Sequence, residues 1–489
     1  MTATENPPQT SAAAATSPTR LRPLSIIGYG AGDAANNLAF TTATMFLLVY
    51  YTDVAGISAA AAGTLLLVVR VFDAFADVFA GRIVDRTYSR RFGKFRPFIL
   101  FGSVPLLLLS VATFSVPQIG ESGMLLYAYL TYAALGLAYS LVNIPYGSLA
   151  GAMTQNPSDR AKLGTARTIG AAVVGAGLGI FIAPLLTPDA DLQFLFTSMT
   201  LGFVVVGTAL YLFTFFTAKE VVQRDVPRVT MKQSVATLKG NKPLLLLCIS
   251  SLLLLTGMLS SSTAQLYFLR DVFGALNLYP VLSLLQLVMI FVIAPFVPRI
   301  VRRFGKRTVY IAAGFVSAAG SGIAFIAPTV WVAFAGMVLS MVGLLLINML
   351  IWALEADTVE YGEWKTGVRT EGITYALFSF TRKTGQAVGG ALAAYALAIG
   401  GYVAGAEVQT DAASWGIRAG AALIPAVFAL LAVAVMFLYP LTDERHAEIV
   451  AEIAERRAAA GSAVPISPDL STSAFRAQDA TSPRPTEDD

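Results

Sequence analysis

The chain has 489 residues, of which 56% are hydrophobic and only 13% are charged, and its formal net charge is +4. Because soluble globular proteins carry about 25% charged residues, this composition excludes a soluble protein and indicates that lipid surrounds much of the chain. The single cysteine, Cys248, excludes an internal disulfide, and the single histidine, His446, leaves almost no material for a Cys/His metal site or a Ser-His-Asp triad.

The hydrophobic segments form two groups of six. A transmembrane helix needs about 20 apolar residues, and the spans of the first group are expected at 24–51, 57–84, 97–117, 123–150, 165–186 and 192–217. Those of the second group are expected at 243–269, 277–299, 307–327, 330–358, 371–401 and 415–440. Twelve spans divided by a charged central loop are the layout of the major-facilitator fold.

The sequence therefore predicts an all-α, multi-pass protein of the cell inner (plasma) membrane. The expected parts are a disordered N-terminal tail at 1–22, with no cleaved signal, and a six-helix half at 23–218. A central loop at 219–242, a second six-helix half at 243–442 and a C-terminal tail at 443–489 follow. We expect a protein that functions as a monomer in the lipid bilayer, without nucleic acid or cofactor.

Lysine and arginine fix the expected orientation. The loops after the second and the eighth span are strongly basic, whereas the stretches 52–58, 118–123 and 187–192 contain no positive charge. Because basic loops stay on the cytoplasmic side, both termini and the central loop should face the cytoplasm. The two basic loops also share a repeat, RRFGK at 90–94 and at 302–306, which supports two parallel halves.

Two acids lie deep in the second span. Asp73 and Asp77 are four residues apart and share a helical face with Arg70. An acid at this depth costs at least about 2.5–3.5 kcal/mol, so it must face a partner, a cavity or an ion. Two carboxylates one turn apart repel each other unless they share a proton or a metal ion, which is the chemistry of a proton- or sodium-coupling site. The alternative is a structural ion pair with Arg70 or a distant lysine.

Two cations lie at mid-depth in the span at 371–401. Arg382 and Lys383 are adjacent, so their side chains diverge by about 100° around the helix. Only one of them can pair simply with Asp73 or Asp77. The other is then available for an anionic substrate, since a guanidinium binds a carboxylate through two hydrogen bonds. The alternative is that both are structural counter-ions.

Polar side chains, most of them amides, phenols and hydroxyls, gather in the first and fourth spans. These polar positions, together with Arg167 in the fifth span, are Asp33, Asn36, Asn37, Tyr139, Ser140, Asn143 and Tyr146. Hydrogen bonding between helices is the simpler explanation for any one of them. Facing one cavity together, they favour a ligand with many hydroxyl groups.

An acidic cluster ends the tenth span. It contains Asp357 and Glu360, and Arg369 follows it. We interpret it as a gate on the cytoplasmic side that binds the basic loop of the other half, which contains Arg90, Arg91 and Lys94. No nucleophile or general base is near it in the sequence, so an enzyme site is not expected.

Several of these motifs resemble one family. The stretches DAFAD (73–77), RRFGKFRPF (90–98), NIPY (143–146), ADTVEYGEW (356–364) and TGVRTEG (366–372) are similar to those of the glycoside–pentoside–hexuronide:cation symporters. The resemblance extends from about Ser25 to Asp443. Within the family, GDAANNLAF (32–40) and SFTRKTGQAVGG (379–390) are most similar to the bacterial glucuronide carriers.

The resemblance implies roles for single residues. Asp73, Asp77 and Ser140 fall on the cation site of the family's melibiose permeases, and Arg167 and Lys383 fall on central basic residues. The two sugar-binding aspartates of those permeases correspond to Asn37 and Asn143 in this chain. A tryptophan of their sugar pocket corresponds to Gly147, and Arg382 stands where they have an apolar residue. Fewer negative charges and one more positive charge would suit an acidic sugar.

The sequence thus predicts a symporter that imports β-D-glucuronides with H⁺ or Na⁺, the ion lying at Asp73, Asp77 and Ser140. Its expected sugar contacts are Asn37, Tyr139, Asn143, Arg167, Arg382 and Lys383. A symporter of neutral glycosides, pentosides or oligosaccharides is the first alternative. A lipid-handling relative, a sensor and a membrane enzyme are more remote alternatives.

Overall fold

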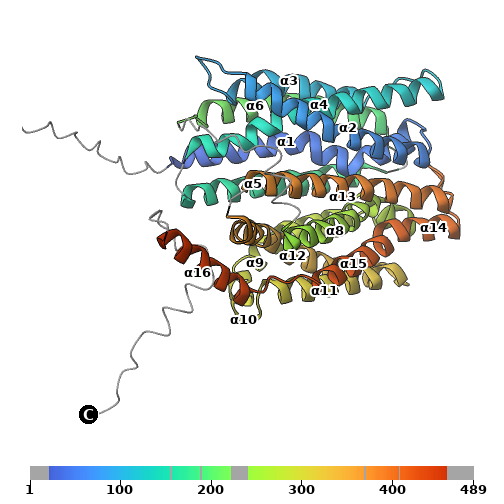
Figure 1. Ribbon diagram of the computed structural model, residues 1–489. Coiled ribbons are helices and arrows are strands. Elements are labelled where there is room, and N and C mark those ends of the chain that lie inside the picture. The colour runs from blue at the N-terminus through green and yellow to red at the C-terminus, as the bar shows by residue number, and fades with distance from the viewer. Residues whose placement is uncertain are drawn as a thin grey trace, which may run out of the picture.

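The computed structural model describes residues 21–154, 157–187, 190–221, 240–367, 371–406 and 408–459, and within these ranges the chain is helical apart from loops and one isolated bridge, Ser89–Gly93. Of the expected tails at 1–22 and 443–489, residues 1–20 and 460–489 lie outside the described residues, as do most of the central loop and Arg369. Figure 1 shows the helices as two stacked groups, one blue to green and one yellow to red.

The first group begins with α1 (Pro23–Val49), which continues into η1 (Tyr50–Val54). It then contains α2 (Ala59–Arg86), α3 (Arg96–Thr113) and α4 (Glu121–Met153). The last two helices are α5 (Pro157–Gly177), extended by η2 (Leu178–Ile182) and η3 (Ala183–Leu185), and α6 (Leu192–Thr217).

The second group begins with α8 (Lys242–Tyr267) and η4 (Phe268–Val272). The next helices are α9 (Leu278–Ile293), α10 (Val297–Phe304), α11 (Lys306–Ile326), α12 (Val330–Thr366) and α13 (Glu371–Gly400). The group ends with α14 (Asp411–Arg418), η5 (Ala419–Leu423) and α15 (Ile424–Phe437), after which α16 (Asp443–Ala459) lies against α12.

Nine helices of the described residues are long and apolar enough to cross a membrane, or ten if α9 and α10, which meet at a 58° bend, form one span. The predicted number was twelve. The long helices α1 and α13 are not among those that pass. Both carry charged or amide side chains at mid-length, including Asp33 and Asn37 in α1 and Arg382 and Lys383 in α13.

The two groups repeat one packing scheme. In the first, α1 packs on α5 and α6, while α3 packs on α4 and α6. In the second, α8 packs on α13 and α15, while α11 packs on α12 and α15. In both groups the first helix therefore packs on the fifth and sixth, and the third helix packs on the fourth and sixth, which is the packing expected of a duplicated six-helix unit.

The RRFGK repeat has a structural role that explains its glycine. Gly93 and Gly305 both have positive φ, +86° and +80°, where other residues are strained. After each glycine, the third helix of that group begins. A carboxylate from the segment that follows the sixth helix of the same group binds near this start. Glu220 accepts hydrogen bonds from the backbone N–H groups of residues 94, 95 and 96, at 2.8, 2.8 and 3.0 Å. Asp443 accepts one from the N–H of Lys306, at 2.9 Å.

Candidate functional site

One carboxylate joins the two groups of helices at mid-length. The Ser140 hydroxyl of α4 donates a hydrogen bond to Oδ1 of Asp77 on α2, at 2.6 Å. The other oxygen of Asp77, Oδ2, pairs with the ammonium of Lys383 on α13. The structure thus brings together three of the predicted site residues, and the contact between Asp77 and Lys383 links one half of the molecule to the other.

The second acid of this helix has a different environment. Asp73 lies 3.7 Å from the guanidinium of Arg70, and its Oδ1 is buried without a hydrogen-bond partner among the described residues. Gly136 makes room for it, because a Cβ there would lie 1.9 Å from that oxygen. A small cavity of about 30 Å³ adjoins the carboxylate and is lined by α1, α2 and α4. Its size suits one water molecule or one bare ion.

Arg167 and Asn37 meet an acid to which the sequence reasoning gave no role. Nε of Arg167 on α5 donates to Oδ1 of Asp33 on α1, at 2.8 Å, and the amide of Asn37 donates to Oδ2 at 3.0 Å. Thr41 donates to the Asn37 carbonyl oxygen at 2.8 Å. Asp33 is only 5% exposed. A mid-helix acid must find a cation inside the membrane, and that requirement is the sequence signal for this pair.

Tyr139 and Asn143 lie one helical turn apart on α4. The Tyr139 ring stacks on Phe40, with 5.3 Å between the ring centroids. Oδ1 of Asn143 is buried without a hydrogen-bond partner in the described part of the chain. Both side chains are half-buried, as expected of residues that face a cavity.

Arg382 and Lys383 diverge as the helix geometry requires. While Lys383 points to α2, the guanidinium of Arg382 lies over the rings of Trp352 on α12 and Phe378 on α13, 5.2 and 5.8 Å from their centroids. Arg382 therefore contacts the aromatic side chains of its own half in this structure.

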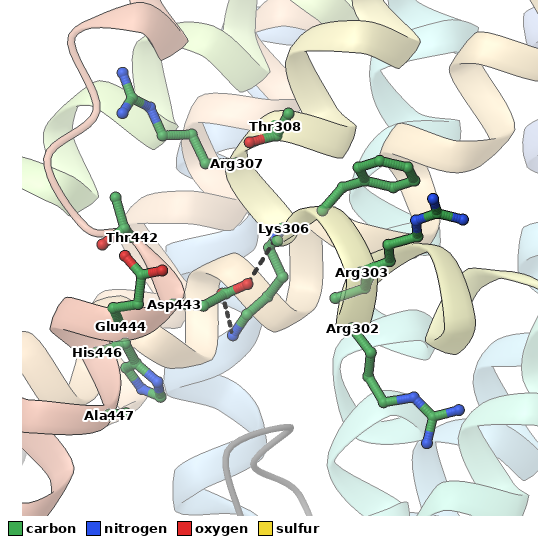
Figure 2. Close-up of a pocket in the computed structure, with 13 residues that line it drawn as sticks. Arg302, Arg303, Lys306, Arg307, Thr308, Thr442, Asp443, Glu444, His446 and Ala447 are labelled. Carbon is green, nitrogen blue, oxygen red and sulfur yellow. Dashed lines mark hydrogen bonds and ion pairs between the residues drawn. The ribbon is translucent and has the colours of Figure 1, made fainter. Parts of the chain in front are cut away.

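The acidic cluster at the end of α12 also finds partners in its own half. Asp357 pairs with Lys306, and His446 of α16 contacts Glu360 and lies 3.5 Å from Asp357. A cavity of about 340 Å³ adjoins these residues, where the second RRFGK segment faces the start of α16 (Figure 2). The prediction had paired the cluster with the first basic loop, in which Arg91 and Lys94 lie over the neighbouring rings of Phe92 and Phe95.

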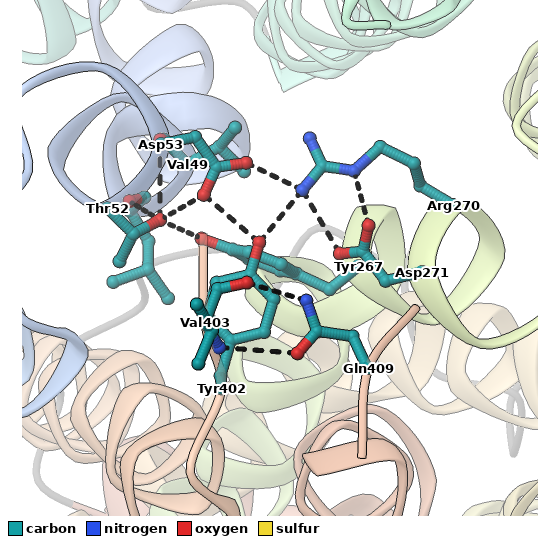
Figure 3. A network of polar contacts seen from close by, with 10 residues as sticks. Val49, Thr52, Asp53, Tyr267, Arg270, Asp271, Tyr402, Val403 and Gln409 are labelled. Atoms are coloured by element: carbon teal, nitrogen blue, oxygen red, sulfur yellow. Dashed lines mark hydrogen bonds and ion pairs between the residues drawn. The ribbon is translucent and has the colours of Figure 1, made fainter. Parts of the chain in front are cut away.

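A polar network that sequence reasoning missed joins the halves at the end of the bundle opposite α16 (Figure 3). Arg270 of η4 donates to Asp53 of η1 at 2.6 Å and to Asp271 at 2.8 Å. The Tyr402 hydroxyl, beyond α13, accepts from Arg270 at 3.0 Å and donates to Asp53 at 3.1 Å. Beside it, Thr52 and Tyr267 share a hydrogen bond of 2.9 Å. These contacts hold the halves together at that end.

Comparison with known proteins identifies the family. Residues 28–443 match the family described as MFS/sugar transport protein. The chain belongs to this family. It is a multi-pass membrane transporter of the glycoside–pentoside–hexuronide symporter type, with a sugar-type substrate and cation coupling implied by the family, and it is not an enzyme.

Named relatives cover nearly the whole chain. A glucuronide carrier protein homologue of Escherichia coli (strain K12) is 47% identical over 439 residues, which are 88% of this chain and 95% of the relative. The isoprimeverose transporter of Lactiplantibacillus pentosus is 32% identical over 446 residues, 88% of this chain and 91% of the relative.

Solved structures resemble the fold. A bacterial homologue of the human lysosomal transporter Spinster, in an inward-facing and unoccupied conformation, superimposes with a TM-score of 0.63. The match covers 85% of this chain and 95% of the other at 13% identity, so it shows the fold alone.

Proposed function

We propose that this transporter imports β-D-glucuronides across the inner membrane together with one cation, H⁺ or Na⁺, by alternating access of its two halves. The observation that carries the proposal is the geometry of Arg167. Arg167 donates to Asp33 through Nε, its guanidinium carbon lies 5.4 Å from the centroid of the Tyr146 ring, and 38% of its side chain is exposed. A guanidinium held in this way presents two donors to a sugar carboxylate.

The charges around the mid-membrane region support an acidic cargo. The cationic side chains of this region are Arg70, Arg167, Arg382 and Lys383, and its anionic side chains include Asp33, Asp73, Asp77 and the buried Glu355. An anionic sugar would give these cations a further carboxylate partner, and a low-dielectric environment strengthens that attraction. The 47% identity to a glucuronide carrier homologue agrees with this choice of substrate.

The coupling step is proposed to be a competition for Asp77. A proton or sodium ion that binds at Asp73 and Asp77, with Ser140 as a further oxygen ligand, would compete with Lys383 for the Asp77 carboxylate. Lys383 would then be released to meet the substrate carboxylate beside Arg167. Ion and sugar would each favour binding of the other through one lysine, which is reciprocal coupling between two sites.

Alternating access requires a closed end and an open end. We place the network of Asp53, Arg270 and Tyr402 on the periplasmic side, as the distribution of basic loops predicts, and both termini in the cytoplasm. The network would then keep the outer side shut while the half-to-half contacts of the inner side are released. Arg90, Arg91, Lys94, Asp357, Glu360 and Arg369 stay proposed as the inner gate.

Uptake into membrane vesicles tests the substrate and the ion. A labelled aryl glucuronide should accumulate under an imposed pH or sodium gradient, and the gradient that drives it names the ion. A neutral aryl glucoside should compete poorly. If the glucoside outcompetes the glucuronide, the acidic-sugar proposal is wrong, and the second candidate, a symporter of neutral glycosides, takes its place. That candidate is favoured by Asn37, Tyr139 and Asn143 and by the isoprimeverose transporter relative.

Arg382 has a separate test. If it leaves Trp352 to meet the substrate carboxylate during transport, Arg382→Gln should weaken uptake of a glucuronide more than uptake of its neutral analogue. Equal losses for both substrates would assign Arg382 to the aromatic contacts of its own half.

A further inference from the structure

A second cavity lies in the C-terminal half, away from the charged residues. It measures about 130 Å³ and is lined by α8, α9, α11, α12 and η5. Its polar lining comes mainly from Ser261, Ser262 and Gln265 of α8, Gln286 of α9 and Asn348 of α12, and its apolar lining is rich in methionine and leucine. The described residues that line it include no charged side chain.

Four of these polar side chains have no hydrogen-bond partner in the part of the chain that the structure describes. Ser321 and Ser340 bind each other at 2.8 Å, and Asn348 donates to the carbonyl of Leu344 at 3.0 Å. Ser261, Ser262, Gln265 and Gln286, in contrast, make no side-chain hydrogen bond within the described residues. Polar groups at membrane depth that lack a partner are costly unless they line a water-filled cavity or bind a ligand.

The cavity lies next to one of two smaller spaces near the acids. The space beside Asp73 shares Arg70 and Tyr132 with a second space at the junction of the halves. Leu259 and Thr263 of α8 line that junction space, and their sequence neighbours Met258 and Ser262 line the cavity of the C-terminal half. Consecutive residues lie about 100° apart on a helix, so the two spaces occupy adjoining faces of α8.

We infer that this cavity binds the uncharged aglycone of a transported glycoside. The inference rests on the proposed function, because it assigns the sugar to Arg167, Asn143 and Lys383 on the other side of the junction. A cavity of about 150 Å³ accepts a benzene ring, so the volume suits a single ring. Thioethers pack on aromatic faces, and the amides and hydroxyls bind polar ring substituents. Without a charge in its lining, the cavity does not attract the sugar carboxylate.

A cysteine-protection experiment tests the inference directly. The chain's single cysteine, Cys248, is buried, so a Cys248→Ser background carrying Gln265→Cys presents one thiol in the cavity. Phenyl β-D-glucuronide at ten times its Kd should slow alkylation of that thiol about tenfold. Methyl β-D-glucuronide at ten times its own Kd should slow it little. Ser58→Cys, at an exposed position before α2, is the matched control and should react at one rate throughout.

A plug variant gives a second readout. Ser262→Leu places a larger side chain of α8 in the cavity, so a phenyl group should fit less well. The KM for phenyl glucuronide should rise about tenfold, while the KM for methyl glucuronide should stay unchanged. Equal protection by both ligands, no protection by either, or equal changes in both KM values would each overturn the inference.

The two proposals fail in different ways. If the wild-type protein transports neither glucuronide, the proposed substrate is wrong, and the same protection experiment is then run with phenyl and methyl β-D-glucoside. Protection that depends on the phenyl group supports the aglycone subsite with a neutral sugar. Protection that is equal for the two glucosides, or absent, overturns it.

Discussion

The two halves of this transporter share a packing scheme but differ in the chemistry of their inner walls. In both, a carboxylate beyond the sixth helix binds the start of the third helix, after a glycine with positive φ. Yet the helices of the N-terminal half contribute Asp33, Arg70, Asp73, Asp77 and Arg167 to the mid-membrane region. The C-terminal half contributes Arg382 and Lys383, but the described residues that line its own cavity are uncharged.

The difference indicates a division of labour. Helix packing depends on small residues and apolar contacts, so duplication can repeat it, whereas each cavity-facing side chain can change without altering the packing. The charged wall is suited to an ion and a carboxylate, and the neutral wall to the uncharged remainder of a glycoside. The helix α13 joins the two, because Lys383 of the C-terminal half pairs with Asp77 of the other.

The largest expected effect comes from removing the charge of Asp77, the carboxylate of the N-terminal half that pairs with Lys383 of the C-terminal half. Asp77→Asn should lower gradient-driven accumulation at least about 100-fold, because an amide neither exchanges a proton nor balances Lys383, and an unpaired charge in the membrane costs several kcal/mol. Substrate binding, measured by equilibrium dialysis, should persist. Asp191→Asn is the matched control, since it removes an exposed acid before α6, outside the proposed ion site and the network of Asp53. Full accumulation by Asp77→Asn would remove this residue from the ion site.

A substitution with a smaller expected effect tests whether the charge or the planar geometry of Arg167 matters for the substrate. Arg167→Lys retains a positive charge but loses the planar pair of donors and the Nε bond to Asp33. We expect the KM for a glucuronide to rise about tenfold, the size of one lost charge-assisted hydrogen bond. The KM for a neutral glucoside should change less. A uniform rise for both substrates would show that Arg167 only positions α1 against α5.

A change at the contact between the halves should alter the balance of conformations. Asp53→Asn removes the charge that Arg270 binds across the halves, so the closed end should open more often. A shift of about 1–2 kcal/mol corresponds to roughly a five- to thirtyfold change in the ratio of the two states. Alkylation of a cysteine placed at Thr263 from the periplasmic side, in a Cys248→Ser background, measures it. An unchanged alkylation rate would contradict the assignment of the network as an outer gate.

The smallest expected effect compares the two helix-capping carboxylates. Glu220 binds three backbone N–H groups and Asp443 binds one, so Glu220→Gln should lower the stability more than Asp443→Asn, by about 0.5–2 kcal/mol. Thermal unfolding in detergent, followed by intrinsic fluorescence, gives the two shifts in Tm. If Asp443→Asn has the larger effect, the contact of Asp443 with Lys306 matters more than the cap.

The sequence determined the helical class, the repeat and the family, because apolar segments of membrane length, basic loops and long motifs are local properties. It also placed Asp73 and Asp77 on one face of a helix, and it predicted that Arg382 and Lys383 would diverge. The division into two halves at 23–218 and 243–442 and the count of twelve spans remain predictions from the sequence.

Only the tertiary structure decided which groups meet. In the structure Lys383 pairs with Asp77 rather than with Asp73, and Arg167 pairs with Asp33. Arg382 lies over the Trp352 ring, and Asp53 pairs with Arg270 across the two halves. Helical periodicity states which side chains share a face, but it contains neither the rotation of one helix against another nor the identity of the neighbour. In a membrane those two facts decide the partner of every buried charge, and so they decide where an ion and a sugar can bind.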